Sequence, residues 1–198
     1  MLAQKANRLG INTILQLGDF GIWHDARSYL DTLEKIAKRA ELTIYFIGGN
    51  HEDYDEIARW KFGPDRDGFV SMLPHVRWIP RGHRWTWTGI RFGALGGAFS
   101  VDWHYRTPGI DWWPGVEEVR HEDVERLGDA WLDELVTHDA PEGAQPALGH
   151  WDFMPGDEER ARVSQRRLRE AVNATHPKLV LHGHWHVRNQ RTIEEPNG

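Results

Sequence analysis

The chain has 198 residues, enough for one domain with a substantial core, and its content of hydrophobic (39%) and charged (27%) residues is typical of a globular protein. The net charge of −6 argues against a general affinity for nucleic acid or anionic membranes, although bound divalent cations would reverse the local sign at a nucleotide site. The absence of cysteine excludes disulfides, thiolate metal ligands and cysteine nucleophiles, and it favours a reducing, cytoplasmic location. No apolar run reaches the roughly 18 residues of a membrane span, and no signal-peptide core is visible.

The N-terminal part alternates helices with short strands. Apolar or small residues at helical spacing predict a helix over residues 1–9. Thr13–Leu17 and Thr43–Ile47 have the β-branched and apolar composition of buried strands. An amphipathic helix over residues 25–40 is expected between them, and a short helix is expected over residues 54–60.

The remainder has a strand-rich middle and then returns to alternation. In chain order we expect strands at 76–80, 84–88 and 90–95, an aromatic loop at 103–115, a helix at 116–131, a strand at 134–137, a helix at 157–174 capped by Asp157, and a strand at 178–181. This order predicts an α/β fold in which two sheets pack against each other and helices flank both, in a single domain over residues 1–198.

The sequence contains 11 tryptophans, many of them in the middle third. We interpret this cluster as core and rim packing of the β-rich layer. The alternative is a stacking surface for a base, which would make the chain a nucleic-acid-binding module. The acidic balance and the lack of basic clustering around these tryptophans disfavour that alternative.

Four of the expected strands end in turns that carry possible metal ligands. Asp19, Asn50 and His138 each follow a strand within three residues, and His184 and His186 follow the last one. Ligand sites collect at the carboxyl ends of strands in α/β sheets, and this oxygen and nitrogen set suits manganese, iron, zinc or a similar divalent ion. His184 and His186 would point the same way in an extended segment. Each motif alone is typical of an ordinary turn, but their ordered occurrence predicts one site.

These motifs resemble those of the calcineurin-like metallophosphoesterase superfamily. The matching segments are GD at 18–19, GNHE at 49–52, VTHDAP at 136–141 and GHWH at 183–186. The segment GGAFSVD at 96–102, followed by Arg106, is similar to bacterial and phage members. The resemblance implies a metallophosphoesterase-type α/β/β/α sandwich. It also implies hydrolysis of phosphomonoesters or phosphodiesters by a metal-activated water.

The resemblance also implies a ligand set for two divalent ions, which could be manganese, iron, zinc, nickel or magnesium. Asp19 would bridge the two ions. Asn50, His138 and His184 would complete the shell of one ion, and His186 would belong to the other. Two such ions about 3.5–4 Å apart can hold a phosphoryl group and activate water without a protein nucleophile.

Four other residues near the motifs have more than one possible role. The resemblance places His51 beside the substrate, either as proton donor to the leaving oxygen or as a hydrogen bond to the phosphoryl group. Arg106 is a candidate contact to the substrate phosphate, and the alternative is a solvated surface arginine. Asp139 is expected to orient His138 or to cap its own turn. His150 is a further residue that could line the cleft.

One part of the family pattern is missing. The pattern opens with Asp-x-His at the end of a first strand, and this sequence has no such motif upstream of Gly18. We therefore expect a domain that is N-terminally incomplete and lacks the first strand. The second metal position, left with Asp19 and His186, is expected to be weak or empty.

The leading hypothesis is a metal-dependent phosphoester hydrolase. The alternative is a metal-binding protein with weak or no catalysis. The expected partner is a phosphate-ester substrate. Nucleic acid would be a partner only as substrate, no membrane association is expected, and the oligomeric state is left open.

Overall fold

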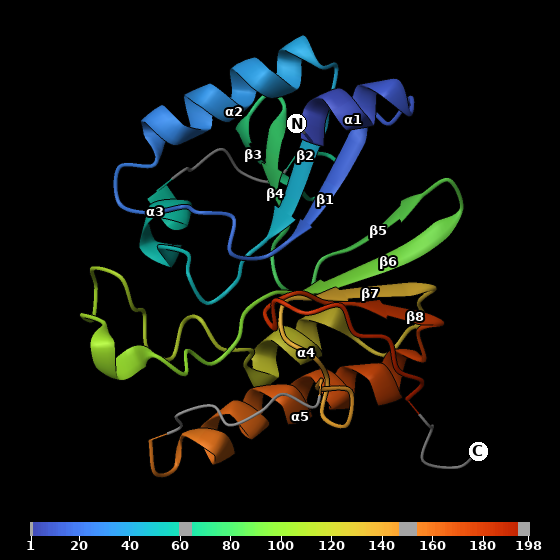
Figure 1. Ribbon diagram of the computed structural model, residues 1–198. Coiled ribbons are helices and arrows are strands. Elements are labelled where there is room, and N and C mark those ends of the chain that lie inside the picture. Colours follow the sequence, from blue (N-terminus) through green and yellow to red (C-terminus); the bar gives the residue numbers. More distant parts are fainter. Residues whose placement is uncertain (1, 60–64, 147–153, 194–198) are drawn as a thin grey trace.

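Two four-stranded sheets face each other, with helices on both outer sides (Figure 1). This computed structural model describes residues 2–59, 65–146 and 154–193. The arrangement is the α/β/β/α sandwich expected from the sequence, and both sheets are mixed. None of the helices in the described ranges has the length and apolar character needed to cross a membrane.

The first sheet has the strand order β1-β2-β4-β3 and is covered by the N-terminal helices. Its strands are β1 (Thr13–Leu17), β2 (Thr43–Ile47), β3 (Val70–Leu73) and β4 (Val76–Trp78). The helices before and between them are α1 (Leu2–Arg8), α2 (Arg27–Arg39) and α3 (Tyr54–Arg59). β1, β2 and β4 are parallel, whereas β3 pairs antiparallel with β4 at the edge.

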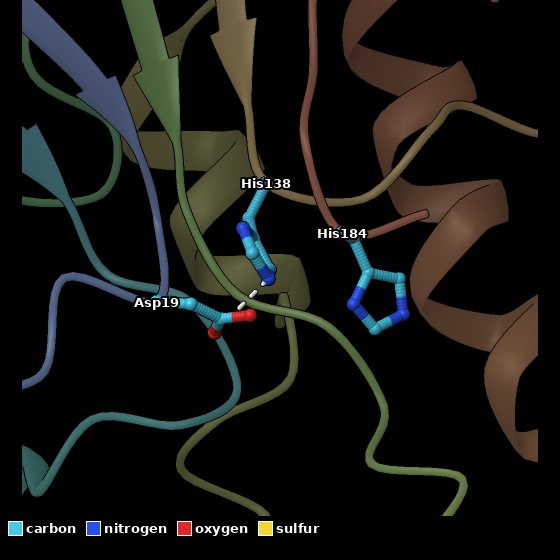
Figure 2. Close-up of side chains that lie close together, drawn as sticks. All are labelled: Asp19, His138 and His184. Atoms are coloured by element: carbon cyan, nitrogen blue, oxygen red, sulfur yellow. Dashed lines mark ion pairs between the residues drawn. The ribbon is translucent and has the colours of Figure 1, made fainter. Parts of the chain in front are cut away.

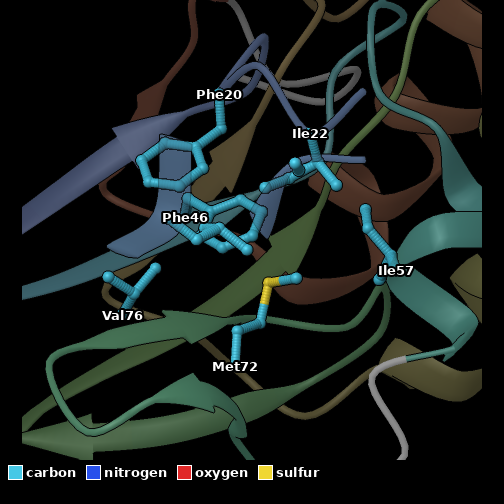
Figure 3. Packing of buried hydrophobic residues seen from close by; sticks show 8 residues of the cluster. Phe20, Ile22, Phe46, Ile57, Met72 and Val76 are labelled. Carbon is cyan, nitrogen blue, oxygen red and sulfur yellow. The ribbon is translucent and has the colours of Figure 1, made fainter. Parts of the chain in front are cut away.

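Alternation along β2 gives the first sheet two apolar faces. Phe46 belongs to the cluster beneath α2 and α3, where it stacks on Phe20 with ring centroids 4.1 Å apart (Figure 3). Tyr45 and Ile47 belong to the cluster between the two sheets. This is the two-residue period of a strand that is buried on both faces.

The second sheet has the order β5-β6-β7-β8 and is covered by the last two helices. Its strands are β5 (Arg84–Trp87), β6 (Ile90–Leu95), β7 (Glu134–Thr137) and β8 (Leu179–Leu181). The helices are α4 (His121–Leu127), α5 (Asp157–Thr175) and the short 3₁₀ helix η1 (Trp103–Tyr105). Leu135 of β7 and Leu168 of α5 lie in the same buried cluster, which fixes the helices on the sheet.

The tryptophans of the middle third pack, as expected. Trp85 stacks on Phe92 with centroids 5.2 Å apart, and Trp87 joins them in the cluster between the sheets. Trp103 and Trp112 donate their indole N–H groups to carboxylates, namely those of Asp157 and Glu117 respectively. Trp103 and Trp112 thus combine ring packing with a satisfied donor, whereas Nε1 of Trp85 is buried without a hydrogen-bond partner among the described residues.

Three expectations for the elements need correction. β3 was not expected, because its four residues, VSML, are too short for a recognisable period. The helix expected over 116–131 is confined to α4, since Gly128 is its C-cap and has a positive φ of +72°. Asp157 begins α5 but does not cap it: the N-cap is Gly156, and the Asp157 carboxylate accepts from Trp103 and from the Met154 backbone N–H.

Candidate metal centre

The loops that follow β1, β7 and β8 meet at the carboxyl ends of these strands. Nδ1 of His138 donates to the carbonyl oxygen of Leu17 at 2.5 Å. The backbone N–H of Gly183 donates to the carbonyl oxygen of His138 at 3.0 Å. Because β1 belongs to the first sheet and the other two strands to the second, the site joins the two halves of the sandwich.

Asp19, His138 and His184 form one compact group, with a ligand atom of each within 4.8 Å of the others (Figure 2). Oδ1 of Asp19 lies 3.3 Å from Nε2 of His138. The rings of His138 and His184 have centroids 5.1 Å apart. Asn50 joins this group, since its Oδ1 lies 3.1 Å from the same Nε2. The structure therefore brings together four of the five predicted ligands.

The donor pattern of this group fits a bound cation. A carbonyl oxygen only accepts, so the contact with Leu17 places a proton on Nδ1 of His138. In the neutral ring, the lone pair of Nε2 then faces two oxygen acceptors, from Asp19 and Asn50. A positive charge between these three converging atoms, either a metal ion or a proton on Nε2, is therefore favourable. A histidine whose second nitrogen donates to a backbone carbonyl is also the usual form of a metal-ligating histidine.

Two glycines allow this close approach. Gly18 has φ +94°, and a Cβ atom there would lie 2.1 Å from Nδ1 of His138. A Cβ atom at Gly49 would lie 2.2 Å from Oδ1 of Asp19. Any side chain at either position would displace a predicted ligand, which explains glycine in both motifs.

Electrostatics set the protonation states of the group. Burial would raise the pKa of Asp19, but the hydrogen bond and charge of His138, with the charges of His51 and His184, hold that pKa well below its usual value. Burial would lower the pKa of His138, but its hydrogen bond to Asp19 outweighs burial and raises it. Burial and the charge of His138 lower the pKa of His184 to about 3. The ionised carboxylate of Asp19 and the neutral imidazole of His184 are forms that bind metals, whereas His138, whose pKa is raised, would give up its Nε2 proton to a bound ion.

Sequence reasoning assigned no role to Glu52 and Ser100, and both support the site. The buried carboxylate of Glu52 accepts from the backbone N–H groups of Asp19 (3.2 Å), Gly21 (3.0 Å) and Gly49, and so ties the loops after β1 and β2 together. Ser100 accepts from Nδ2 of Asn50 at 3.0 Å, which turns Oδ1 of Asn50 towards His138. The position of Glu52 in the GNHE motif, at residues 49–52, was the sequence feature that could have indicated its supporting role.

The segment that carries the last two histidines is not extended. β8 ends at Leu181, and both His184 (φ +65°) and His186 (φ +53°) are left-handed. The prediction that an extended segment directs the side chains of His184 and His186 the same way is therefore wrong. His186 is exposed and lies outside the compact group, but it lines the same cavity of about 450 Å³ as Asp19, His138 and His184. Its role as a ligand stays a prediction.

His51 and Arg106 lie next to the metal group. The backbone N–H of His51 donates to Oδ1 of Asp19 at 3.2 Å, and burial lowers the pKa of its ring. Arg106 is not a solvated surface arginine, because its side chain is only 6% exposed. Its Nη2 lies 2.7 Å from Nε2 of His51. His150, the other cleft candidate, lies outside the described residues.

Comparison with known proteins agrees with this fold. Residues 1–188 match the family described as calcineurin-like phosphoesterase, and the chain belongs to this family. The chain is also 25% identical, over 165 residues, to the lariat debranching enzyme of Danio rerio. That similarity covers 76% of this chain and 28% of the relative's length. No solved structure gives a significant match.

Proposed function

We propose that the chain is a metal-dependent hydrolase of phosphomonoesters or phosphodiesters. The observation that carries the proposal is the convergence of three acceptor atoms, from Asp19, Asn50 and His138, on one point beside His184. Oxygen and imidazole ligands of this kind suit manganese, iron, zinc, nickel or magnesium. Family membership supports phosphoester hydrolysis as the reaction.

In this proposal Asp19, Asn50, His138 and His184 hold one ion, and Asp19 with His186 faces a second. Bound ions would supply a hydroxide nucleophile and neutralise charge on the phosphoryl group. The chain's own residues hold the ligands in place: Leu17 fixes the His138 ring through its carbonyl group, and Ser100 fixes the Asn50 amide. His51 stands beside Asp19, where a bound ester would lie.

The geometry of the site supports a phosphate ester as substrate, and several classes of ester fit it equally well. The cavity of about 450 Å³ beside the metal group is lined by polar residues such as Gln16 and His182 and by apolar ones such as Leu17 and Val187. The relative's name makes lariat debranching one specific activity to test on this chain. A contact between Arg106 and the substrate phosphate also stays part of the proposal, although its guanidinium group already has several partners.

A second candidate is a metal-binding protein with weak or no catalysis. The position of His186 favours it, because this residue lies outside the compact group and leaves one well-formed ligand set. Such a chain would bind one ion and keep the fold without assembling a dinuclear centre.

Metal content measured together with turnover separates the two candidates. The purified chain would be loaded with manganese, its bound metal counted, and its hydrolysis of p-nitrophenyl phosphate and bis(p-nitrophenyl) phosphate followed. The hydrolase proposal expects turnover of at least one ester that disappears with a chelator. A fully loaded chain that hydrolyses neither ester would support the second candidate.

A further inference from the structure

A second cavity, of about 750 Å³, lies along the outer edge of β8, and we call it the edge groove. β8 is the last strand of its sheet, and among the described strands it pairs only with β7 (Figure 1). The walls of the groove come from β8, from residues 169–173 of α5 and from the segment 187–193. The groove shares His182 and Val187 with the metal cavity, so the two cavities adjoin.

The backbone of β8 is open along this groove. Val180 packs against the cluster under α5 and Leu181 against the cluster between the sheets, so both faces of the strand are covered. The outer edge is not covered, because no backbone hydrogen bond joins β8 to residues 187–193 within the described ranges. That segment is held instead by the side chain of Asn189, which donates to the carbonyl oxygen of Ala144 at 3.1 Å. An open edge of this kind can pair with an extended chain.

The charged residues that line the edge groove share one sign. Four of them are cationic, namely Arg169, Lys178, Arg188 and Arg191. None of the lining residues is Asp or Glu, although the chain has 30 acidic residues and a net charge of −6. Lys178 shares its charge with Asp133 at 3.1 Å. Arg188 and Arg191 are exposed, and no ion pair joins either to a described carboxylate. The groove therefore favours an anionic occupant.

The uncharged lining residues favour a peptide over nucleic acid. Single-stranded nucleic acid is usually held by bases that stack on aromatic side chains, and no Phe, Tyr or Trp lines the groove. Aliphatic side chains line it instead, and those of Leu179 and Val187 are 47% and 48% exposed. An extended peptide presents its side chains alternately to two sides, so apolar and acidic residues can each meet a matching wall. A second copy of the chain, paired edge to edge, would bring the same cations together, and like-charge repulsion opposes that pairing.

We propose that the edge groove is a docking site for an acidic peptide segment of a partner protein, which adds to the second sheet as a strand beside β8. The peptide main chain pairs with β8, its carboxylates meet Arg188 and Arg191, and its apolar side chains cover Leu179 and Val187. The site is separate from the metal ligands, and docking requires no hydrolysis. Because His182 follows β8 and lines both cavities, one end of the docked peptide lies beside the metal cavity.

Fluorescence anisotropy of a labelled acidic peptide tests the charge of the occupant. The probe is a blocked hexapeptide of alternating glutamate and valine, and its matched partner alternates lysine and valine. We expect the acidic peptide to bind at least tenfold more tightly than the lysine peptide or an oligothymidylate with the same number of charges. Tighter binding of the oligothymidylate, or no binding of the acidic peptide at millimolar concentration, would overturn the proposal. The titration is repeated in chelator, because binding that disappears with the metal would assign the carboxylates to the metal centre and would also overturn it.

Arg188→Ala combined with Arg191→Ala tests the groove itself. Both side chains are exposed on a segment without helix or strand, so we expect this double variant to keep the fold and to bind the acidic peptide at least tenfold more weakly. Arg27→Ala combined with Arg162→Ala is the matched control. It makes the same change in net charge at two exposed arginines outside the groove, and its affinity should stay within twofold of the parent chain. Equal losses in the two double variants would reveal a general charge effect and contradict the docking site.

Two N-methylated versions of the acidic peptide test the added strand. The N–H groups of an extended chain alternate between its two edges, so methyl groups on the glutamates or on the valines each block one edge. We expect at least one version to bind tenfold or more weakly than the parent peptide. Full affinity of both versions would refute pairing with β8. Sedimentation of the free chain completes the test, because self-association that the acidic peptide does not reverse would assign the edge to a second copy and overturn the proposal.

Discussion

The indole N–H of Trp185 donates to Oδ1 of Asp139 at 2.9 Å. Trp185 stands between His184 and His186, and Asp139 follows His138, so this bond joins the loops that carry the histidine ligands. The same carboxylate caps its own turn by accepting from the Ala140 N–H at 2.7 Å. Asp139 thus caps the turn, as one of the two expectations had it. The His138 ring is oriented by a different group, the Leu17 carbonyl.

Trp185→Phe should weaken metal binding about 10–100-fold, because the loop bearing His184 loses its tie to Asp139. Calorimetric titration with manganese measures this effect. Trp103→Phe is the matched control: it also removes an indole donor from a buried carboxylate, that of Asp157, but outside the metal group. Equal loss of affinity in both variants would show that the effect is general destabilisation.

Asn50→Ala and His184→Ala should each release metal, since both side chains belong to the proposed ligand set. Metal bound to the native state alone should stabilise the parent chain by about 2.7 kcal/mol at 100 times its Kd. Thermal melts with and without manganese would show the shift in the parent chain and not in the two variants. His75→Ala, which removes a histidine paired with Glu34, should keep the full shift. A shift that survives in both ligand variants would contradict the assignment.

Glu117 should make the metal-free chain less stable as the pH rises. Burial raises its pKa from 4.5 to about 7, so folding favours the protonated form. The unfolding free energy is highest below the unfolded pKa of 4.5, falls between 4.5 and about 7, and is then constant, with a total loss on the order of 3 kcal/mol. Urea unfolding in chelator, at pH values from 5 to 8, would show this fall reduced in Glu117→Gln. The same slope in both chains would argue against the shift.

The fold was largely predictable because the predicted metal ligands lie in the turns directly after apolar strands. Each predicted ligand follows an apolar strand, and the parallel pairings bring the carboxyl ends of neighbouring strands together. β3 was missed because tertiary pairing with β4, rather than a period of its own, makes it a strand.

Parts of the site depend on long-range contacts that spacing does not reveal. Arg106 meets His51 across 55 residues, and Glu52 meets Asp19 across 33. The left-handed turns at His184 and His186 depend on the local chain path after β8, which a two-residue period cannot anticipate. The sequence therefore predicts that Asp19, Asn50, His138 and His184 come together, but it does not reveal the groups that orient them.

The central claim is most directly tested by metal-dependent turnover in Asp19→Asn and in Asp65→Asn, which alters a carboxylate paired with Arg77 outside the metal group. Each chain would be stripped with chelator and titrated with manganese while hydrolysis of the two p-nitrophenyl esters is followed. We predict that turnover rises with bound metal in the parent chain and in Asp65→Asn, and that Asp19→Asn loses both metal and turnover. A parent chain that binds manganese fully and hydrolyses neither ester, or an Asp19→Asn chain that remains fully active, would contradict the account.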